Sequence, residues 1–162
     1  MILPAGAAGV AAQMLASDIA GTRFVDAPVS DAWNARTNTE GIERFLAPKA
    51  AKVESWAGGA FGLWVGVETP EGARGSEGCR MHSVKPMEQL VFEWNAPPPI
   101  PAIRVRRTLV DLDFKQRPGN RTELTPRNYG YGDGEEWPKS GAHFARARPA
   151  VTASLEQRFA PK

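Results

Sequence analysis

The sequence predicts an α+β domain in which a curved antiparallel β-sheet folds around a long C-terminal helix and encloses a mostly apolar pocket. Three observations predict it. The order of elements is one strand, two short helices, a run of strands and a long helix, which is typical of α+β and not of alternating α/β proteins. Large apolar side chains recur at helical spacing from Trp137 to Phe159. The length of 162 residues suits one domain, and one helix over a strongly twisted sheet leaves space between the two.

We expect this domain to span residues 18–160 and treat residues 1–17 as a leader. The leader carries no charge and is rich in Ala, Gly, Leu and Val. It resembles the apolar part of a secretory signal, but a basic segment is missing, since the first cation is Arg23. Two alternatives stay open: a small-residue leader on a cytoplasmic protein, or a signal remnant on a periplasmic or secreted one.

The first strand and two short helices follow the leader. Residues 19–25 are β-prone and end before Pro28. Pro28 has the fixed φ of a first helical turn, and a helix is predicted over 28–37. Its helically spaced positions are Val29, Ala32, Trp33 and Arg36. A second short helix is predicted after Thr39 as a cap, and it ends before Pro48.

A meander of strands comes next, separated by glycine- and proline-containing turns. The strand segments are predicted at 52–56, 61–67, 74–84, 89–94, 103–114 and 122–129. In the segment 89–94, alternation places Leu90, Phe92 and Trp94 on one face. Four prolines make 95–101 a stiff loop, because proline has no N–H for a β-ladder. Pro126 is an unusual residue inside the last strand.

The final helix is amphipathic and about six turns long. Its apolar positions include Trp137, Phe144, Val151 and Phe159. Pro149 lies inside the pattern and is expected to bend the helix or split it in two.

Several short motifs occur in a characteristic order. They are Asp26-Ala27-Pro28-Val29, Thr37-Asn38-Thr39-Glu40-Gly41, Phe45-Leu46-Ala47-Pro48, Gly58-Gly59-Ala60-Phe61, Arg74-Gly75-Ser76-Glu77-Gly78, Leu90-Val91-Phe92-Glu93-Trp94-Asn95-Ala96-Pro97-Pro98 and Glu136-Trp137. Over residues 19–159 this order resembles the domains related to the activator of Hsp90 ATPase, within the START-like or Bet v 1-like helix-grip superfamily.

The resemblance implies a helix-grip fold with two short helices after the first strand and a cavity under the last helix. The chain departs from the family pattern at two positions. Pro126 stands where many relatives carry a histidine, and Arg148 stands where they carry an aromatic residue before the helix proline. Stimulation of Hsp90 depends on additional structure in the eukaryotic protein and is not carried over, although a co-chaperone-like interaction module stays open as an alternative.

The candidate site is the set of side chains expected to line this cavity. Ligand pockets are mainly apolar and aromatic with a few polar groups, whereas for any single aromatic residue ordinary core packing is the alternative. The predicted ligand-binding residues are Trp33, Phe45, Phe61, Trp64, His82, Phe92, Trp94, Tyr129, Trp137, Phe144, Arg148 and Val151. Trp64, Phe92 and Trp94 are expected to form the floor, with the helix residues Trp137, Phe144 and Val151 as the lid. Arg148, if it turns inward, pairs with an acidic head group of the ligand.

The expected partner is a small, largely apolar molecule. We expect the protein to bind it, and the sequence does not establish a catalysed reaction. An enzyme of cyclase or hydrolase type in the same pocket stays open, with His82, Glu77, Tyr129 and Arg148 as its candidate residues; no catalytic residue is assigned. One cysteine, Cys79, and two histidines give no metal-ligand set, and the glycine runs lack phosphate-binding spacing. No cofactor or metal is therefore expected.

Charge and hydropathy limit the other partners. A net charge of +2 gives no field for nucleic acid, and the arginines at 104, 106 and 107 are expected on a strand with a solvated outer face. No segment reaches the roughly 18 apolar residues of a membrane helix, so no stable membrane insertion is expected. A monomer or a homodimer fits the sequence.

Overall fold

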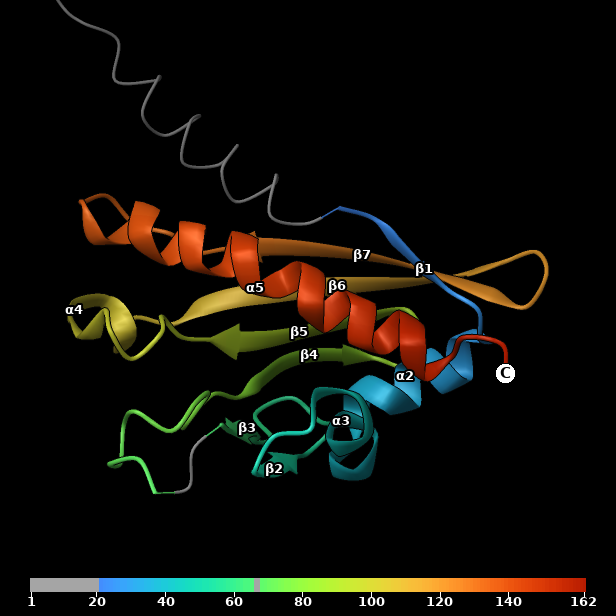
Figure 1. Ribbon diagram of the computed structural model, residues 1–162, viewed down its shortest axis with the longest axis horizontal. Coiled ribbons are helices and arrows are strands. Elements are labelled where there is room, and N and C mark those ends of the chain that lie inside the picture. The colour runs from blue at the N-terminus through green and yellow to red at the C-terminus, as the bar shows by residue number, and fades with distance from the viewer. Residues whose placement is uncertain (1–20, 66–67) are drawn as a thin grey trace, which may run out of the picture.

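The structure is a computed structural model that describes residues 21–65 and 68–162. The predicted leader, residues 1–17, lies outside the described residues. A five-stranded antiparallel sheet forms the body of the molecule (Figure 1), in the order β1-β7-β6-β5-β4. Its strands are β1 (Arg23–Val25), β4 (Met81–Lys85), β5 (Gln89–Trp94), β6 (Thr108–Arg117) and β7 (Arg121–Tyr129).

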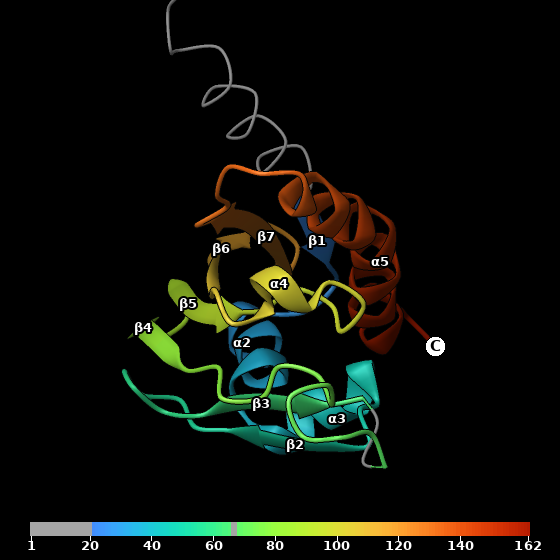
Figure 2. The same cartoon turned by 90° about the vertical axis from the view of Figure 1, so that its left-hand side faces the viewer.

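A two-stranded hairpin extends this sheet. Strands β2 (Ala50–Val53) and β3 (Phe61–Trp64) pair with each other. They reach β4 through an isolated bridge between Ala60 and Arg80, and through the backbone hydrogen bond from Met81 N to Gly59 O of 2.8 Å. The strand pairing at this junction is irregular, which allows the strands to change direction there. Seen along its length in Figure 2, the molecule has β6, β7 and β1 on one side and the β2–β3 hairpin opposite.

The described part of the chain contains four helices. They are α2 (Val29–Thr37), α3 (Thr39–Leu46), α4 (Pro101–Arg104) and α5 (Glu136–Arg158). The long helix α5 contacts α3, β1 and α4, and it closes the open side of the curved strands (Figure 2). This is the α+β helix-grip architecture that the sequence predicts, with a long C-terminal helix and two short helices after the first strand.

The two short helices meet through their backbones. Asn38 separates them, and its side-chain oxygen accepts a hydrogen bond of 2.7 Å from Gly41 N, which caps α3. A Cβ atom at Gly41 would lie 2.3 Å from the carbonyl oxygen of Asn34 in α2. Only glycine allows so close an approach, which explains its place in the motif of residues 37–41.

Alternation along the strands separates an apolar inner face from a polar outer face. Inner residues such as Leu90, Leu112 and Phe114 belong to the main core cluster. In this cluster Trp33 of α2 packs edge-on against Phe114, with ring centroids 5.1 Å apart. Leu155 of α5 is fully buried in it.

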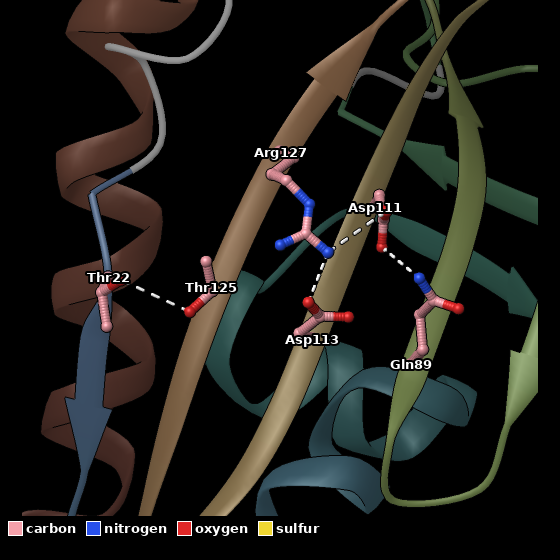
Figure 3. A network of polar contacts seen from close by, with 6 residues as sticks. All are labelled: Thr22, Gln89, Asp111, Asp113, Thr125 and Arg127. Atoms are coloured by element: carbon pink, nitrogen blue, oxygen red, sulfur yellow. Dashed lines mark hydrogen bonds and ion pairs between the residues drawn. The ribbon is translucent and has the colours of Figure 1, made fainter.

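The outer face carries a network of polar contacts (Figure 3). Arg127 of β7 lies between Asp111 and Asp113 of β6 and forms ion pairs with both. Gln89 of β5 donates a hydrogen bond of 3.0 Å to Asp111. The hydrogen bond to Asp113 raises the pKa of Arg127 above its usual value. The network ties strands β5, β6 and β7 together.

Two expectations about elements are wrong, and one alternative of a third is excluded. The strand predicted over 103–114 begins at Thr108, because residues 101–104 form the one-turn helix α4; Arg104 is therefore on a helix. The strand predicted over 74–84 begins at Met81, since Gly75 and Gly78 adopt positive φ angles of 146° and 69° and the chain turns there. Of the bend or split expected at Pro149, the split does not occur, since helix α5 is continuous from Glu136 to Arg158.

Candidate functional site

The inner face of the sheet presents an aromatic floor beneath α5. Phe61 of β3 and Phe92 of β5 have ring centroids 4.2 Å apart, and Trp94 lies 6.1 Å from Phe61 and 6.3 Å from Phe92. Phe61 and Phe92 are buried, whereas Trp94 is half-buried. Two rings of the floor are thus shielded from solvent, and the third, that of Trp94, is partly exposed.

Helix α5 covers this interior unevenly. Trp137 near its beginning is 5% exposed and Leu155 near its end is fully buried. Between them, Phe144, Arg148 and Val151 follow at spacings of four and three residues, and all three are half-buried. The helix is therefore packed tightly at both ends and less tightly in the middle.

Polar groups enter the same interior from three elements. Arg148 of α5 donates a hydrogen bond to Oδ1 of Asn128, which is buried on β7. Arg36 is near the end of α2, and its guanidinium carbon lies 4.9 Å from the ring centroid of Phe45. The Nε atoms of Arg36 and Arg148 and the Nδ2 atom of Asn128 are shielded from solvent, and no described residue accepts a hydrogen bond from any of them.

The electrostatics confirm that the two arginines sit in a poorly solvated place. Burial, followed by the positive charge of Arg148, lowers the pKa of Arg36 from 12.5 to about 10. Burial also lowers the pKa of Arg148, which the nearby Tyr131 hydroxyl partly offsets. Arg36 stays protonated at neutral pH, and the positive charge of Arg148 acts on it.

Sequence reasoning missed Arg36 and Asn128 as site residues, although both had a signal. Arg36 continues the helical stripe of Val29, Ala32 and Trp33, so it belongs to the buried face of α2. Asn128 is two residues from Pro126 and four from the buried Leu124, so the period of a strand points it inward.

Not every predicted pocket residue faces this interior. Trp33 and Phe45 are buried in the same core cluster as Phe61 and Phe92, and Phe45 lies beside Arg36, whereas Trp137 belongs to a smaller cluster with Ala96, Ile100 and Ile103. Trp64 covers Gly62, on the face of β3 opposite Phe61 and Leu63. It is therefore not part of the floor.

His82 and Tyr129 lie on the outside. The ring nitrogen Nε2 of His82 is 3.0 Å from a carboxylate oxygen of Glu93, and the His82 side chain is 48% exposed. The irregular pairing between Met81 and Ser83 accompanies this outward position. Tyr129 pairs with Leu109 at the end of β7 and is 48% exposed.

The four candidate catalytic residues consequently do not converge. Glu77 lies in the segment before β4, where Arg74 Nε is 3.7 Å from its carboxylate. His82 and Tyr129 are on the outer face of the sheet, whereas Arg148 is on its inner side. Cys79 is buried, and burial raises the pKa of its thiol to about 11, which keeps it protonated and unreactive.

Three further features of the described residues bear on partners. No cluster of three or more His, Cys, Asp or Glu side chains in residues 21–65 and 68–162 is placed to hold a metal ion. Within the same ranges, no helix combines the length and the apolar character needed to cross a membrane. A surface cleft of about 600 Å³ lies where α2, α3 and the end of α5 meet, and it is lined by charged residues such as Asp31, Glu40 and Arg158.

Comparisons with known proteins agree with this geometry. A family model described as activator of Hsp90 ATPase homolog 1-like protein matches residues 26–159. No curated protein matches the sequence.

Solved structures share the fold at low sequence identity. The Mesorhizobium loti protein MLL2253 has a TM-score of 0.67 and 21% identity, covering 86% of this chain and 93% of that one. An Hsp90 activator from Plasmodium falciparum has a TM-score of 0.60 and 17% identity, covering 85% and 89%. The Aha1 dimer from Colwellia psychrerythraea has a TM-score of 0.60 and 10% identity, covering 86% and 93%.

Proposed function

The chain belongs to the family of activator of Hsp90 ATPase homolog 1-like proteins, and from this premise we propose that it binds a small, largely apolar molecule between the inner face of the sheet and α5. The observation that carries the proposal is the uneven packing of α5. Phe144 and Val151 stay half-buried above the floor of Phe61, Phe92 and Trp94, although both ends of the helix are tightly packed.

Apolar burial is the source of affinity in this proposal. Removing apolar surface from water contributes about 25 cal/mol per Å² before the cost of association is subtracted. An aromatic floor with a half-buried ring at its edge suits a planar or elongated apolar body. The polar groups inside are few, which is typical of small-molecule sites.

The test is a thermal-shift screen against a panel of apolar metabolites, combined with native mass spectrometry of the protein purified from cells. A bound molecule raises the melting temperature, and the rise grows with the logarithm of its concentration over Kd. Trp94→Ala is expected to reduce that shift strongly. Trp56→Ala is the matched control, because Trp56 is 59% exposed in the turn after β2 and removing it is expected to leave the shift unchanged. A panel with no shift and no retained mass would refute the proposal.

A second candidate is a co-chaperone-like interaction, which the family description and the Plasmodium falciparum likeness favour. It predicts that the chain changes the ATPase rate of an Hsp90 in a coupled assay. An unchanged rate at saturating protein would exclude an activator role and leave ligand binding as the function.

A further inference from the structure

The interior described above holds two positive charges without a matching negative one. Neither Arg36 nor Arg148 forms an ion pair with any described carboxylate, since each ion pair in residues 21–65 and 68–162 uses other cations. The Arg36 and Arg148 side chains are half-buried, and a partly buried charge without an ion-pair partner is costly, because its surroundings solvate it less well than water does. Two like charges near each other raise that cost further.

Three hydrogen-bond donors of this region come from separate elements, and two of them belong to side chains in direct contact, since Arg148 donates a hydrogen bond to Asn128. Nε of Arg36 comes from α2, Nδ2 of Asn128 from β7 and Nε of Arg148 from α5, and all three are shielded from solvent with no acceptor among the described residues. Buried polar atoms in native proteins are nearly always paired. Three shielded donors without an acceptor, two of them on neighbouring side chains, indicate that the missing group is an acceptor.

Aromatic rings hold the guanidinium groups in place. Arg36 lies over Phe45 at 4.9 Å and Arg148 lies near Phe144 at 5.8 Å, both measured from the guanidinium carbon to the ring centroid. A guanidinium over a ring keeps its N–H groups free at the edge. Planar guanidinium edges match carboxylates and bind them with two parallel hydrogen bonds.

We propose that the occupant of this interior is an apolar carboxylic acid, whose carboxylate is held by Arg36, Asn128 and Arg148 while its apolar body lies on Phe92 and Trp94. This inference rests on the proposed function and names the class of ligand. The carboxylate supplies the acceptor that the three donors lack. It also neutralises the repulsion between the two arginines.

The binding test uses matched pairs of probes at pH 7: decanoate against decan-1-ol, and 2-naphthoate against 2-naphthol. Within at least one pair, the acid is expected to bind about tenfold more tightly than the neutral partner, as for a charge-assisted hydrogen-bond pair. Arg148→Gln removes that preference and leaves the affinity for the neutral partner unchanged. Arg146→Gln is the control, because Arg146 lies exposed on the same helix and its loss leaves the preference intact.

A second variant tests the charge pair without any ligand. Asn128→Asp keeps the shape of the side chain and places a carboxylate beside Arg148 Nη2. The melting temperature of the ligand-free protein is expected to rise, and the preference for acids is expected to fall. A lower melting temperature would show that the interior does not require an anion and would overturn the inference.

The two proposals fail in different ways. If neutral probes bind as tightly as acids and Arg148→Gln changes neither affinity, the carboxylate inference is wrong while the apolar site stands. If neither member of either pair binds and Asn128→Asp raises the melting temperature, the need for an anion is supported and the apolar occupant is refuted.

Discussion

The hydroxyl of Ser76 stabilises the irregular segment between β3 and β4. Ser76 is 1% exposed. Its Oγ accepts a hydrogen bond of 2.8 Å from Leu63 N and donates one of 3.1 Å to Phe61 O. One side chain thus satisfies two buried backbone groups of β3, which holds Phe61 in position in the aromatic floor.

Replacing this hydroxyl is predicted to destabilise the protein. Ser76→Ala leaves a buried N–H and a buried carbonyl without their partner, which costs about 1–3 kcal/mol. Urea unfolding followed by circular dichroism measures the loss. Ser30→Ala is the control, because Ser30 is exposed and its replacement is expected to change little. Equal stability of the two variants would contradict the role given to Ser76.

The buried thiol of Cys79 is predicted to make stability depend on alkaline pH. Burial raises its pKa from 9.0 to about 11 in the folded protein. Above pH 9 the unfolded chain loses this proton while the folded chain keeps it, so the free energy of unfolding falls between pH 9 and 11. The fall due to this group is roughly 2–3 kcal/mol.

Unfolding curves for the wild type and Cys79→Ala under reducing conditions isolate this contribution, because the other alkaline groups titrate in both proteins. The stability difference between them is expected to be constant below pH 9 and to shift in favour of Cys79→Ala above it. Parallel curves up to pH 11 would show that the thiol titrates normally.

At the level of single residues, sequence patterns predicted the aromatic residues of the floor better than the polar residues of the site. Phe92 and Trp94 follow from simple alternation in 89–94. Arg36 was not recognised, although its helical spacing is clear, because a charged residue on a buried stripe is usually assigned to solvent. Trp64 was misplaced, since the period of a short strand fixes which residues share a face but not which face is the inner one.

Helix α5 accommodates Pro149 on its exposed side. A proline there has no N–H for the carbonyl of Ala145 and crowds that turn, which costs about 3 kcal/mol relative to alanine in a helix interior. The tightly packed ends of the helix, at Trp137 and Leu155, offset this cost. They keep the two halves aligned as one helix.

Pro149→Ala is accordingly predicted to stabilise the protein by about 1–3 kcal/mol, because it restores one helical hydrogen bond. Pro138→Ala is the matched control on the same helix. Pro138 lies in the first turn, where a backbone N–H has no helical partner, so its replacement is expected to change stability little. Thermal unfolding measures both, and a loss of stability in Pro149→Ala would show that the proline geometry is needed for packing.

The order of elements, the alternation of inner and outer residues in β5 and the long helix could all be predicted from the sequence. Each depends on a repeat of apolar residues that is visible within a short segment. Helix α4 could not, since its four residues make a single turn, too short to show a helical repeat, and Ile103 and Val105 alternate like a strand. The segment before β4 could not either, because its turns depend on positive φ angles at Gly75 and Gly78, which glycine permits but does not require.

Across the whole molecule, packing is dense in the strands and at both ends of α5, and looser in the middle of α5. We therefore predict that, in the ligand-free protein, amides of residues 145–152 exchange with solvent about tenfold faster or more than those in the central strand β6. Hydrogen exchange read by mass spectrometry measures this. A bound ligand is expected to reduce this difference in exchange rate between α5 and β6. Equal protection of both segments in the free protein would contradict the uneven packing of α5.

The last strand has a consequence for how copies of this protein behave at high concentration. Strand β1 pairs with Thr122–Leu124 alone, so among the described residues the stretch 125–129 of β7 has no strand on that side. Pro126 lies in this stretch and offers no N–H to an incoming strand, and Arg127 adds a charge. The residue that looked out of place in a strand thus makes this stretch of β7 a poor template for fibril growth.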